Sequence, residues 1–136
     1  MKTVRLGQTG LEVSRVGFGG IPIQRLTEDE AVEVVQRCID LGVTLLDTAN
    51  NYTTSEERIG KSIAGRREQV IIATKTAARD KATALEHLQL SLNRLRTDTI
   101  DLWQFHNVSS LEAYEQVLGP EGAMEAAQEA LRAGKI

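Results

Sequence analysis

The stretch VTLLDTANNYTTSEE (residues 43–57) carries the pattern on which the fold prediction rests. Its first residues are mostly apolar or β-branched, which is typical of a strand. A polar loop follows, and Ser55 with two glutamates then supplies a candidate N-cap and the acidic first turn that favour a helix. We therefore predict a strand over residues 43–48, a polar loop, and a helix from Ser55 to near Gly65.

The same alternation of strand and helix occurs four times along the chain. The predicted strands cover residues 13–20, 43–48, 69–76 and 99–107, and the helices that follow them cover residues 27–41, 55–65, about 85–95 and 123–136. The first helix is the best marked, because Thr27 and Glu30 form a capping-box pattern. Before the first strand, residues 4–13 are typical of a small hairpin with its turn at residues 7–10. Strands that alternate with helices predict parallel β-α-β units.

Two architectures are compatible with four such units. A doubly wound sheet of the flavodoxin type usually has five strands, whereas a (β/α)8 barrel has eight units over roughly 250 residues. The chain ends at Lys135 and Ile136, directly after a predicted helix cap, where a further strand would begin. We therefore expect an α/β fold of the (β/α)8 TIM-barrel type, with only the first four β/α units and the N-terminal hairpin. Residues 1–136 would form the N-terminal half of this barrel domain, truncated at the start of the fifth strand.

Composition limits the classes of partner. The chain has 136 residues, of which 41% are hydrophobic and 26% charged, and a formal net charge of −3 gives no reason to expect nucleic acid or an anionic membrane as a partner. The single cysteine, Cys38, excludes an intrachain disulfide framework. The start MKTVRLGQTG lacks the apolar segment of a signal peptide, and no run approaches the roughly 18 apolar residues of a membrane span. We expect a cytoplasmic protein.

Four polar side chains lie at or after the ends of successive predicted strands. Asp47, Lys75 and His106 end the second, third and fourth strands, and Tyr52 lies in the loop after the second. In both architectures, sites form at the C-terminal ends of parallel strands, so these four side chains would converge. Each alone has a structural explanation, such as a turn residue, a solvated lysine or a half-buried histidine. Together they favour a site, because an ammonium that follows the apolar run VIIAT needs a partner, and Asp47 is the natural one.

This set of side chains suits the reduction of a carbonyl group. A lysine ammonium beside a tyrosine stabilises the phenolate and so makes the phenol a stronger acid. Asp47 would keep Lys75 charged and in place, and His106 would hydrogen-bond a substrate oxygen. Tyr52 would then protonate the carbonyl oxygen as a hydride reaches the carbon. None of the four can supply a hydride, so a nicotinamide cofactor is implied.

The segments LLDTANNY, ATKT and LWQFHN resemble, in this order, the motifs of the aldo-keto reductases. The resemblance covers all 136 residues, from GFGG near the start to the closing ALRAGKI. It implies an eight-unit barrel whose bottom is closed by the N-terminal hairpin. It also implies the reduction of aldehydes or ketones with NADPH or NADH, by a tetrad that would fall on Asp47, Tyr52, Lys75 and His106.

The resemblance assigns residues around this tetrad as well. Those expected to approach the cofactor are Gly19, Gly20, Ile21 and Asp47, and those expected to face the substrate are His106 and Asn107. The segments GFGGIPIQ and QFHNV are closer to a branch of the family that carries an iron–sulfur segment far downstream. The chain departs from the family at Thr53 and Thr54, where a glycine usually follows the tetrad tyrosine. The loop that carries Tyr52 is therefore expected to differ in shape.

Other functions stay open at the level of sequence. The alternatives are two non-catalytic modules, a barrel-like regulatory subunit and a doubly wound receiver-like domain, although VGFGG lacks the acidic pair that a receiver would have near its first strand. Asp47 and His106 lack a third metal ligand at suitable spacing, so no metal site is expected. His87 lies off the leucine face of its helix and is expected to be solvated. Alone, a half barrel would be nearly inactive and would self-associate, since it has unpaired strand edges and an uncovered apolar face.

Overall fold

The computed structural model describes residues 1–136. An antiparallel hairpin of β1 (Thr3–Arg5) and β2 (Glu12–Ser14) precedes a four-stranded parallel sheet. The sheet strands are β3 (Phe18–Gly19), β4 (Leu45–Asp47), β5 (Ile71–Thr76) and β6 (Leu102–Phe105). The helices are α1 (Glu28–Asp40), α2 (Ser55–Ser62), α3 (Lys81–Leu95), α4 (Leu111–Leu118) and α5 (Ala123–Arg132), with short 3-10 turns η1 (Pro22–Arg25) and η2 (Arg67–Gln69). None of the helices is both long and apolar enough to cross a membrane.

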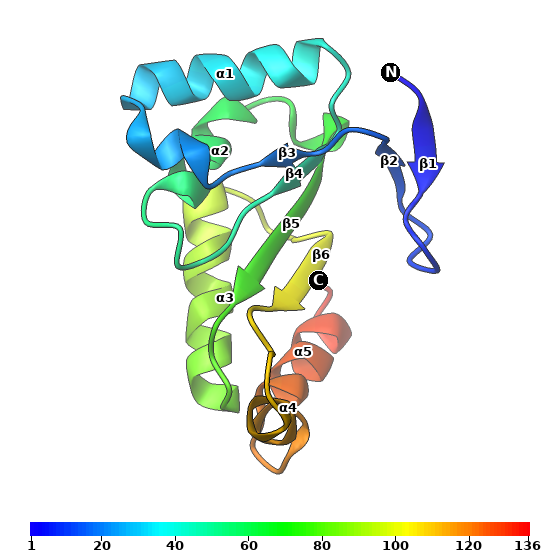
Figure 1. The fold of residues 1–136 in the computed structure, drawn as a ribbon, viewed down its shortest axis with the longest axis vertical. Helices are drawn as coiled ribbons and strands as arrows, with labels where there is room; N and C mark the ends of the chain where they lie inside the picture. The colour runs from blue at the N-terminus through cyan, green and yellow to red at the C-terminus, as the bar shows by residue number, and fades with distance from the viewer.

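The order of the strands decides between the two predicted architectures. The sheet runs β3-β4-β5-β6, so every strand lies beside its neighbour in sequence and the order never reverses. Since parallel crossovers are right-handed, a progression in one direction puts all crossover helices on the same face of the sheet. In Figure 1 these helices form a continuous layer, in which α1 packs on α2, α2 on α3, and α3 on α5. The predicted half of a (β/α)8 barrel is confirmed, and the doubly wound alternative is wrong.

The two faces of the sheet have different surroundings. Leu46 of β4 pairs with Ile72 of β5, and both side chains are fully buried in the core between the sheet and the helices. Because side chains alternate along a strand, the next residues point to the opposite face, which lines the inside of the barrel. The half-buried residues on this inner face are Leu45, Asp47, Ile71, Lys75, Leu102 and Gln104.

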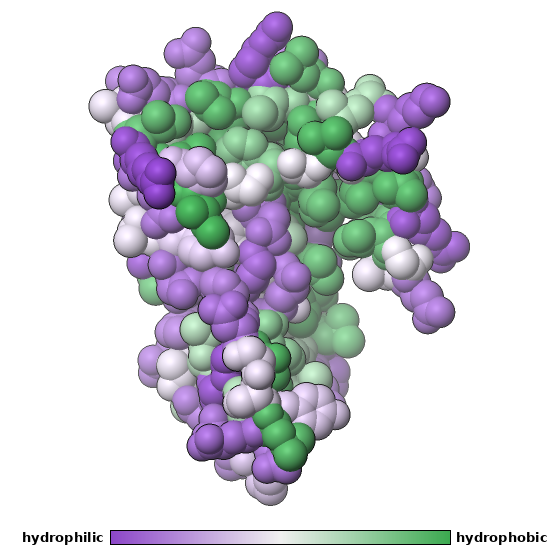
Figure 2. All heavy atoms as spheres, in the orientation of Figure 1, coloured by the Kyte–Doolittle hydropathy of each residue, from purple (hydrophilic) through white to green (hydrophobic).

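The hairpin lies at the N-terminal end of the sheet. Ser14 of β2 and Thr44, which directly precedes β4, exchange two hydrogen bonds of 2.8 and 2.9 Å between backbone N–H groups and side-chain hydroxyls. Figure 2 shows hydrophobic side chains between the hairpin and the sheet, on the right of the view. The opposite, C-terminal end of the sheet is therefore the end left open for a site.

Several local predictions need correction. Residues 13–20 were expected to form one strand, but Val13 and Ser14 belong to the hairpin, and only Phe18 and Gly19 pair with β4. The helix α4 was not predicted, although Leu111, Tyr114 and Leu118 recur at helical spacing along it; only Val117 of this helix is buried. The capping box of α1 is confirmed, since Thr27 Oγ1 accepts from the Glu30 amide and the Glu30 carboxylate accepts from the Thr27 amide.

Candidate active site

The four side chains predicted to converge come together at the C-terminal end of the sheet. Asp47 is the last residue of β4, Lys75 lies one residue before the end of β5, and His106 directly follows β6. Lys75 pairs in register with Gln104, and His106 lies two residues further along, so all three point to the inner face. Tyr52 lies in the loop between β4 and α2.

Lys75 and Asp47 form the ion pair expected from the sequence. The ammonium lies 2.5 Å from Asp47 Oδ1 and donates a second hydrogen bond of 2.7 Å to the carbonyl oxygen of Thr48. Only 15% of the Lys75 side chain is exposed, against 39% for Asp47. The largely desolvated ammonium is thus compensated by a carboxylate and a carbonyl. Gln104 Nε2, on β6, donates to the second carboxylate oxygen at 3.4 Å across the intervening strand β5.

Tyr52 lies between the lysine and the histidine. The Lys75 ammonium is 5.3 Å from the centroid of the phenol ring, within the range of a cation–π contact. The phenol oxygen is 3.5 Å from Nε2 of His106, and the two rings meet edge to face with centroids 5.5 Å apart. The loop fixes the backbone of Tyr52 on both sides, because its amide donates to Ala49 and its carbonyl accepts from the Ser55 amide.

His106 is held as a neutral ring. Its amide donates to the carbonyl of Thr76, and its Nδ1 lies 3.1 Å from Oδ1 of Asn51. Burial lowers the pKa of His106, and the positive charges of Lys75 and Arg79 lower it further, against an opposing effect from Asp47. Because the ordinary pKa is about 6.5, the imidazole is uncharged at neutral pH, so one ring nitrogen is a hydrogen-bond donor and the other an acceptor.

The residues predicted to approach a cofactor border the same end of the sheet. Gly19 pairs in register with Asp47, and a Cβ at Gly19 would meet nothing within 4 Å, so open space lies over the backbone beside the ion pair. A Cβ at Gly20 would lie 2.4 Å from Ser55 Oγ, so packing against α2 already requires glycine there. Ile21 follows Gly20 in the chain, and half of its surface is exposed.

The side chain of Asn107 makes no hydrogen bond to the cluster. Its carbonyl accepts from Arg79 at 3.1 Å, and its backbone is left-handed, with φ of 54°. Sequence reasoning missed two other residues, Gln104 and Asn51, which contact Asp47 and His106 respectively. The signal for Gln104 was present, because a residue two positions before His106 on the same strand shares its face. Nothing in the sequence pointed to Asn51, since its contact depends on the path of the loop.

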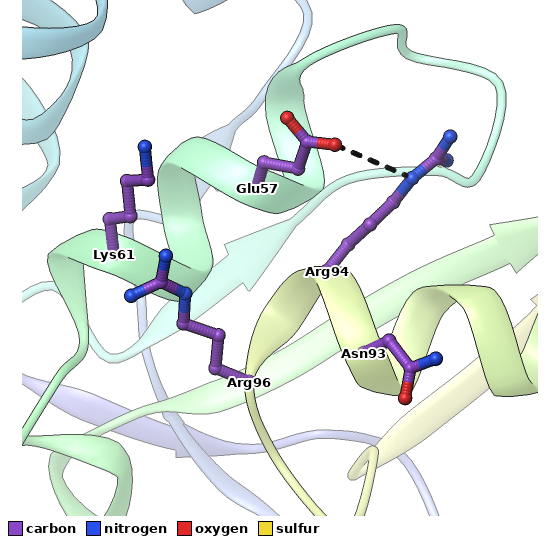
Figure 3. Close-up of a pocket in the computed structure, with 5 residues that line it drawn as sticks. All are labelled: Glu57, Lys61, Asn93, Arg94 and Arg96. Carbon is purple, nitrogen blue, oxygen red and sulfur yellow. Dashed lines mark ion pairs between the residues drawn. The ribbon is translucent and has the colours of Figure 1, made fainter.

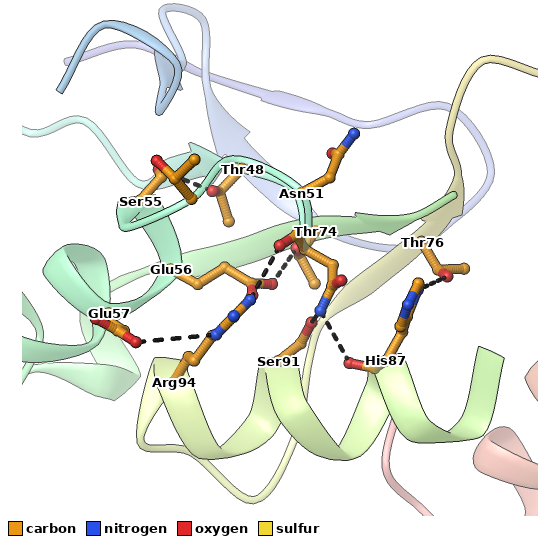
Figure 4. Close-up of polar contacts among 12 residues, drawn as sticks. Thr48, Asn51, Ser55, Glu56, Glu57, Thr74, Thr76, His87, Ser91 and Arg94 are labelled. Atoms are coloured by element: carbon orange, nitrogen blue, oxygen red, sulfur yellow. Dashed lines mark hydrogen bonds and ion pairs between the residues drawn. The ribbon is translucent and has the colours of Figure 1, made fainter. Parts of the chain in front are cut away.

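Behind the sheet, a buried polar network supports the loop that carries Tyr52 (Figure 4). Glu56, at the start of α2, accepts a hydrogen bond of 2.7 Å from Thr74 and lies 3.4 Å from Arg94 of α3. Arg94 also donates to the carbonyl of Asn50, at 3.0 Å. The backbone N–H of Asn50 in turn donates to the backbone carbonyl of Lys75, at 2.9 Å. The loop is therefore tied both to the helix layer and to the strand that carries the lysine.

Two predictions about this back face were wrong. Ser55 is not the N-cap of α2, which is Thr54; the Ser55 hydroxyl is buried, donates to the Gly20 carbonyl and accepts from Thr48. His87 is half-buried rather than solvated, and its Nδ1 lies 2.9 Å from the Thr76 hydroxyl. Both residues were misassigned, Ser55 as a helix cap and His87 as a solvated side chain, because their actual partners are distant in sequence.

A separate hollow of about 360 Å³ is lined by none of the four residues Asp47, Tyr52, Lys75 and His106 (Figure 3). It is lined only by charged or amide side chains, all from α2, α3 or the C-cap of α3: Glu57, Lys61, Asn93, Arg94 and Arg96. It belongs to the helix layer and does not open onto the inner face of the sheet. Nowhere in the chain do three or more acidic, histidine or cysteine side chains gather as a metal site would require.

Known proteins of one family are similar to this chain in sequence and fold. The model of the Aldo/keto reductase family matches residues 15–136. The aldo-keto reductase YhdN of Bacillus subtilis is 36% identical over an alignment that covers all of this chain and 45% of that protein. The chain thus spans about half the length of this relative.

Solved structures agree with this match. An aldo-keto reductase from Bacillus halodurans, in its holo form, superposes with a TM-score of 0.83 at 32% identity, over 100% of this chain and 48% of that one. An aldo/keto reductase from Klebsiella pneumoniae, in complex with NADP and acetate, gives a TM-score of 0.82 at 30% identity, over 99% of this chain and 47% of that one.

Proposed function

The chain belongs to the aldo/keto reductase family, and on this premise we propose that it supplies the catalytic half of a barrel that reduces aldehydes or ketones to alcohols with NADPH or NADH. The observation that carries the proposal is the contact series Asp47–Lys75–Tyr52–His106 at the open end of the sheet. The NADP bound by the relative from Klebsiella pneumoniae supports the choice of cofactor. The open space at Gly19 supports it independently, and Gly19, Ile21 and Asp47 would border the bound nicotinamide.

In the proposed reaction each of the four residues has one task. A nicotinamide held beside Gly19 and Asp47 would supply the hydride that the carbonyl carbon of a small-molecule substrate accepts. Tyr52 donates its phenol proton to the carbonyl oxygen, so that an alcohol forms and a phenolate remains. The Lys75 ammonium stabilises that phenolate, and Asp47 keeps the ammonium charged and in place. Neutral His106, which contacts the phenol oxygen, orients the carbonyl beside it.

Tyr52→Phe tests this assignment, and Tyr114→Phe is the matched control because Tyr114 is exposed on α4 and is not one of the four residues. Both are made in a complete barrel, in which residues 1–136 are joined to four further β/α units. Loss of the general acid should reduce carbonyl-dependent NADPH oxidation by about 10²- to 10⁴-fold, whereas NADPH binding persists. Retained turnover in Tyr52→Phe would refute the role of the phenol. Absence of turnover in the unaltered barrel would favour the regulatory alternative.

We propose further that residues 1–136 alone have little activity and self-associate. The inner face keeps Leu45, Ile71 and Leu102 half-exposed, and both β3 and β6 have one edge without a neighbouring strand in the sheet. An uncovered apolar face with free edges favours association with a second copy. Sedimentation of the 136-residue chain should therefore reveal dimers or larger species. A stable monomer that binds NADPH at micromolar concentration would contradict the proposal.

A further inference from the structure

The loop that carries Tyr52 contains a residue in a backbone conformation that its side chain disfavours. Thr53, the next residue, has φ of 32°, in the left-handed region where a β-branched residue is rare. Glycine adopts this region without a steric penalty. The backbone torsion at Thr53 sets the direction of the chain directly after Tyr52, so whatever stabilises it also affects where the phenol lies.

The Thr53 side chain has one partner, and that partner comes from the first β/α connection. Its hydroxyl donates a hydrogen bond of 2.7 Å to Oε1 of Gln24, in η1. The other end of the Gln24 amide donates to the carbonyl of Ile21, at 3.0 Å. Both ends of the amide are therefore used in one orientation, since a flipped amide would bring its oxygen against the Ile21 carbonyl.

The turn that carries Gln24 is itself firmly held. Ile23 is buried in the main core. The Arg58 guanidinium of α2 donates to the carbonyls of Ile23 and Leu26, the latter at 2.9 Å. On the buried side of the same junction, Ser55 donates to the Gly20 carbonyl at 2.9 Å. Residues 20–24 and 53–55 are thus joined by one buried and one solvent-side hydrogen bond, with Thr53 on the solvent side.

We propose that Gln24 and Thr53 are positioning residues for Tyr52, and that their hydrogen bond holds the loop in a conformation that would otherwise call for glycine. The bond also couples the segment that borders the proposed cofactor space, around Ile21, to the loop that carries the proposed acid. The catalytic consequence rests on the proposed function, whereas the conformational consequence does not.

The proposal is tested by a double-mutant cycle of Gln24→Ala and Thr53→Gly, with Arg25→Ala as the control in the same turn, because Arg25 is exposed and its side chain makes no hydrogen bond. The first readout is amide hydrogen exchange of residues 52–55 in the 136-residue chain. Gln24→Ala should speed this exchange about tenfold when Thr53 is present and less than about twofold in the Thr53→Gly background. Glycine adopts the left-handed conformation without the hydrogen bond to Gln24. Exchange in β5 should not change.

The second readout is kcat and KM in the complete barrel. Gln24→Ala should lower kcat several-fold with Thr53 present and leave the KM for the carbonyl substrate nearly unchanged, and the decrease should vanish in the Thr53→Gly background. Equal effects of Gln24→Ala on exchange in both backgrounds would show that the Thr53–Gln24 hydrogen bond does not hold the loop, whatever the activity. A background-dependent exchange effect with an unchanged kcat would overturn the positioning role. If the unaltered barrel shows no turnover, the proposed function fails. The exchange result still decides whether the Thr53–Gln24 hydrogen bond holds the loop.

Discussion

The two faces of the sheet contrast most clearly at neighbouring residues of β5. Thr74 points to the helix layer, is fully buried and donates to Glu56. Lys75 points to the inner face, and its ion pair with Asp47 stays partly open to solvent. One strand thus presents a satisfied polar network on one side and accessible charges on the other. The difference indicates that the back face stabilises the fold, whereas the front face leaves the pair of charges accessible.

The back face differs from the front in how completely its polar groups are compensated. Glu56 is 1% exposed, yet its two carboxylate oxygens have separate partners, Thr74 and Arg94. A buried carboxylate requires such partners, and their loss is costly. Asp47 can be solvated if Lys75 is removed, because much more of its surface is exposed. Substitutions behind the sheet should therefore affect unfolding more than substitutions in front.

The largest effect on stability is expected from Glu56→Ala, with Glu57→Ala as its matched control. Glu57 is the next residue of α2, is 53% exposed and lies 3.9 Å from Arg94. Glu56→Ala leaves the buried Thr74 hydroxyl without an acceptor and Arg94 without its buried partner, so we expect a loss of about 3 kcal/mol. Glu57→Ala should cost about 0.5 kcal/mol or less, as for other exposed ion pairs.

Urea unfolding of both variants measures this difference. Similar losses for Glu56→Ala and Glu57→Ala would mean that the back network does not stabilise the fold as its burial indicates. The comparison also bears on the loop, because Arg94 holds the carbonyl of Asn50. Hydrogen exchange of residues 49–54 should therefore increase in Glu56→Ala and stay unchanged in Glu57→Ala.

A smaller effect, confined to the front face, is expected from pH. The folded pKa of His106 lies below its ordinary value, because of burial and of Lys75. The unfolded chain therefore binds more protons at and below about pH 6.5, and folding stability falls as the pH decreases through that value toward the folded pKa. The contribution of neutral His106 to the free energy of unfolding is therefore fully present only above about pH 6.5.

His106→Gln removes this titration. The difference in unfolding free energy between pH 7.5 and pH 5.5 should be smaller in His106→Gln than in the unaltered chain, and an NMR titration of the unaltered chain should give His106 a midpoint below about 6.5. An unchanged pH dependence in the variant, or a midpoint above that value, would show that the ring is not held neutral by its surroundings.

The sequence predicts the layers of the fold and the convergence of the four strand-end residues, because both follow from periodicity. Parallel strands that alternate with helices bring their C-terminal ends to one edge, so Asp47, Lys75 and His106 could be grouped without coordinates. The burial of Glu56 could also have been noticed. It lies three residues before Ile59 on the core-facing side of α2, which marks it as a buried position rather than only an acidic first turn.

Other features depend on contacts between segments that are distant along the chain. The left-handed backbone of Thr53 and its bond to Gln24 join residues 29 positions apart, and no local propensity predicts them. Likewise, Asn51 reaches His106 over 55 positions. The split of residues 13–20 between two sheets depends on which partner strand each half meets. These are the parts of the site where tertiary packing overrides the local pattern.

Measuring both the unfolding free energy and the turnover of Tyr52→Phe separates a front face that serves chemistry from one that serves stability. The substitution removes one oxygen atom, whose nearest partner is His106 Nε2 at 3.5 Å. We predict that the unfolding free energy of the 136-residue chain changes by about 0.5 kcal/mol or less, as for a long and partly exposed contact. In the complete barrel, carbonyl-dependent NADPH oxidation should fall by about 10²-fold or more. A variant that keeps its turnover, or that loses as much stability as Glu56→Ala, would contradict the account.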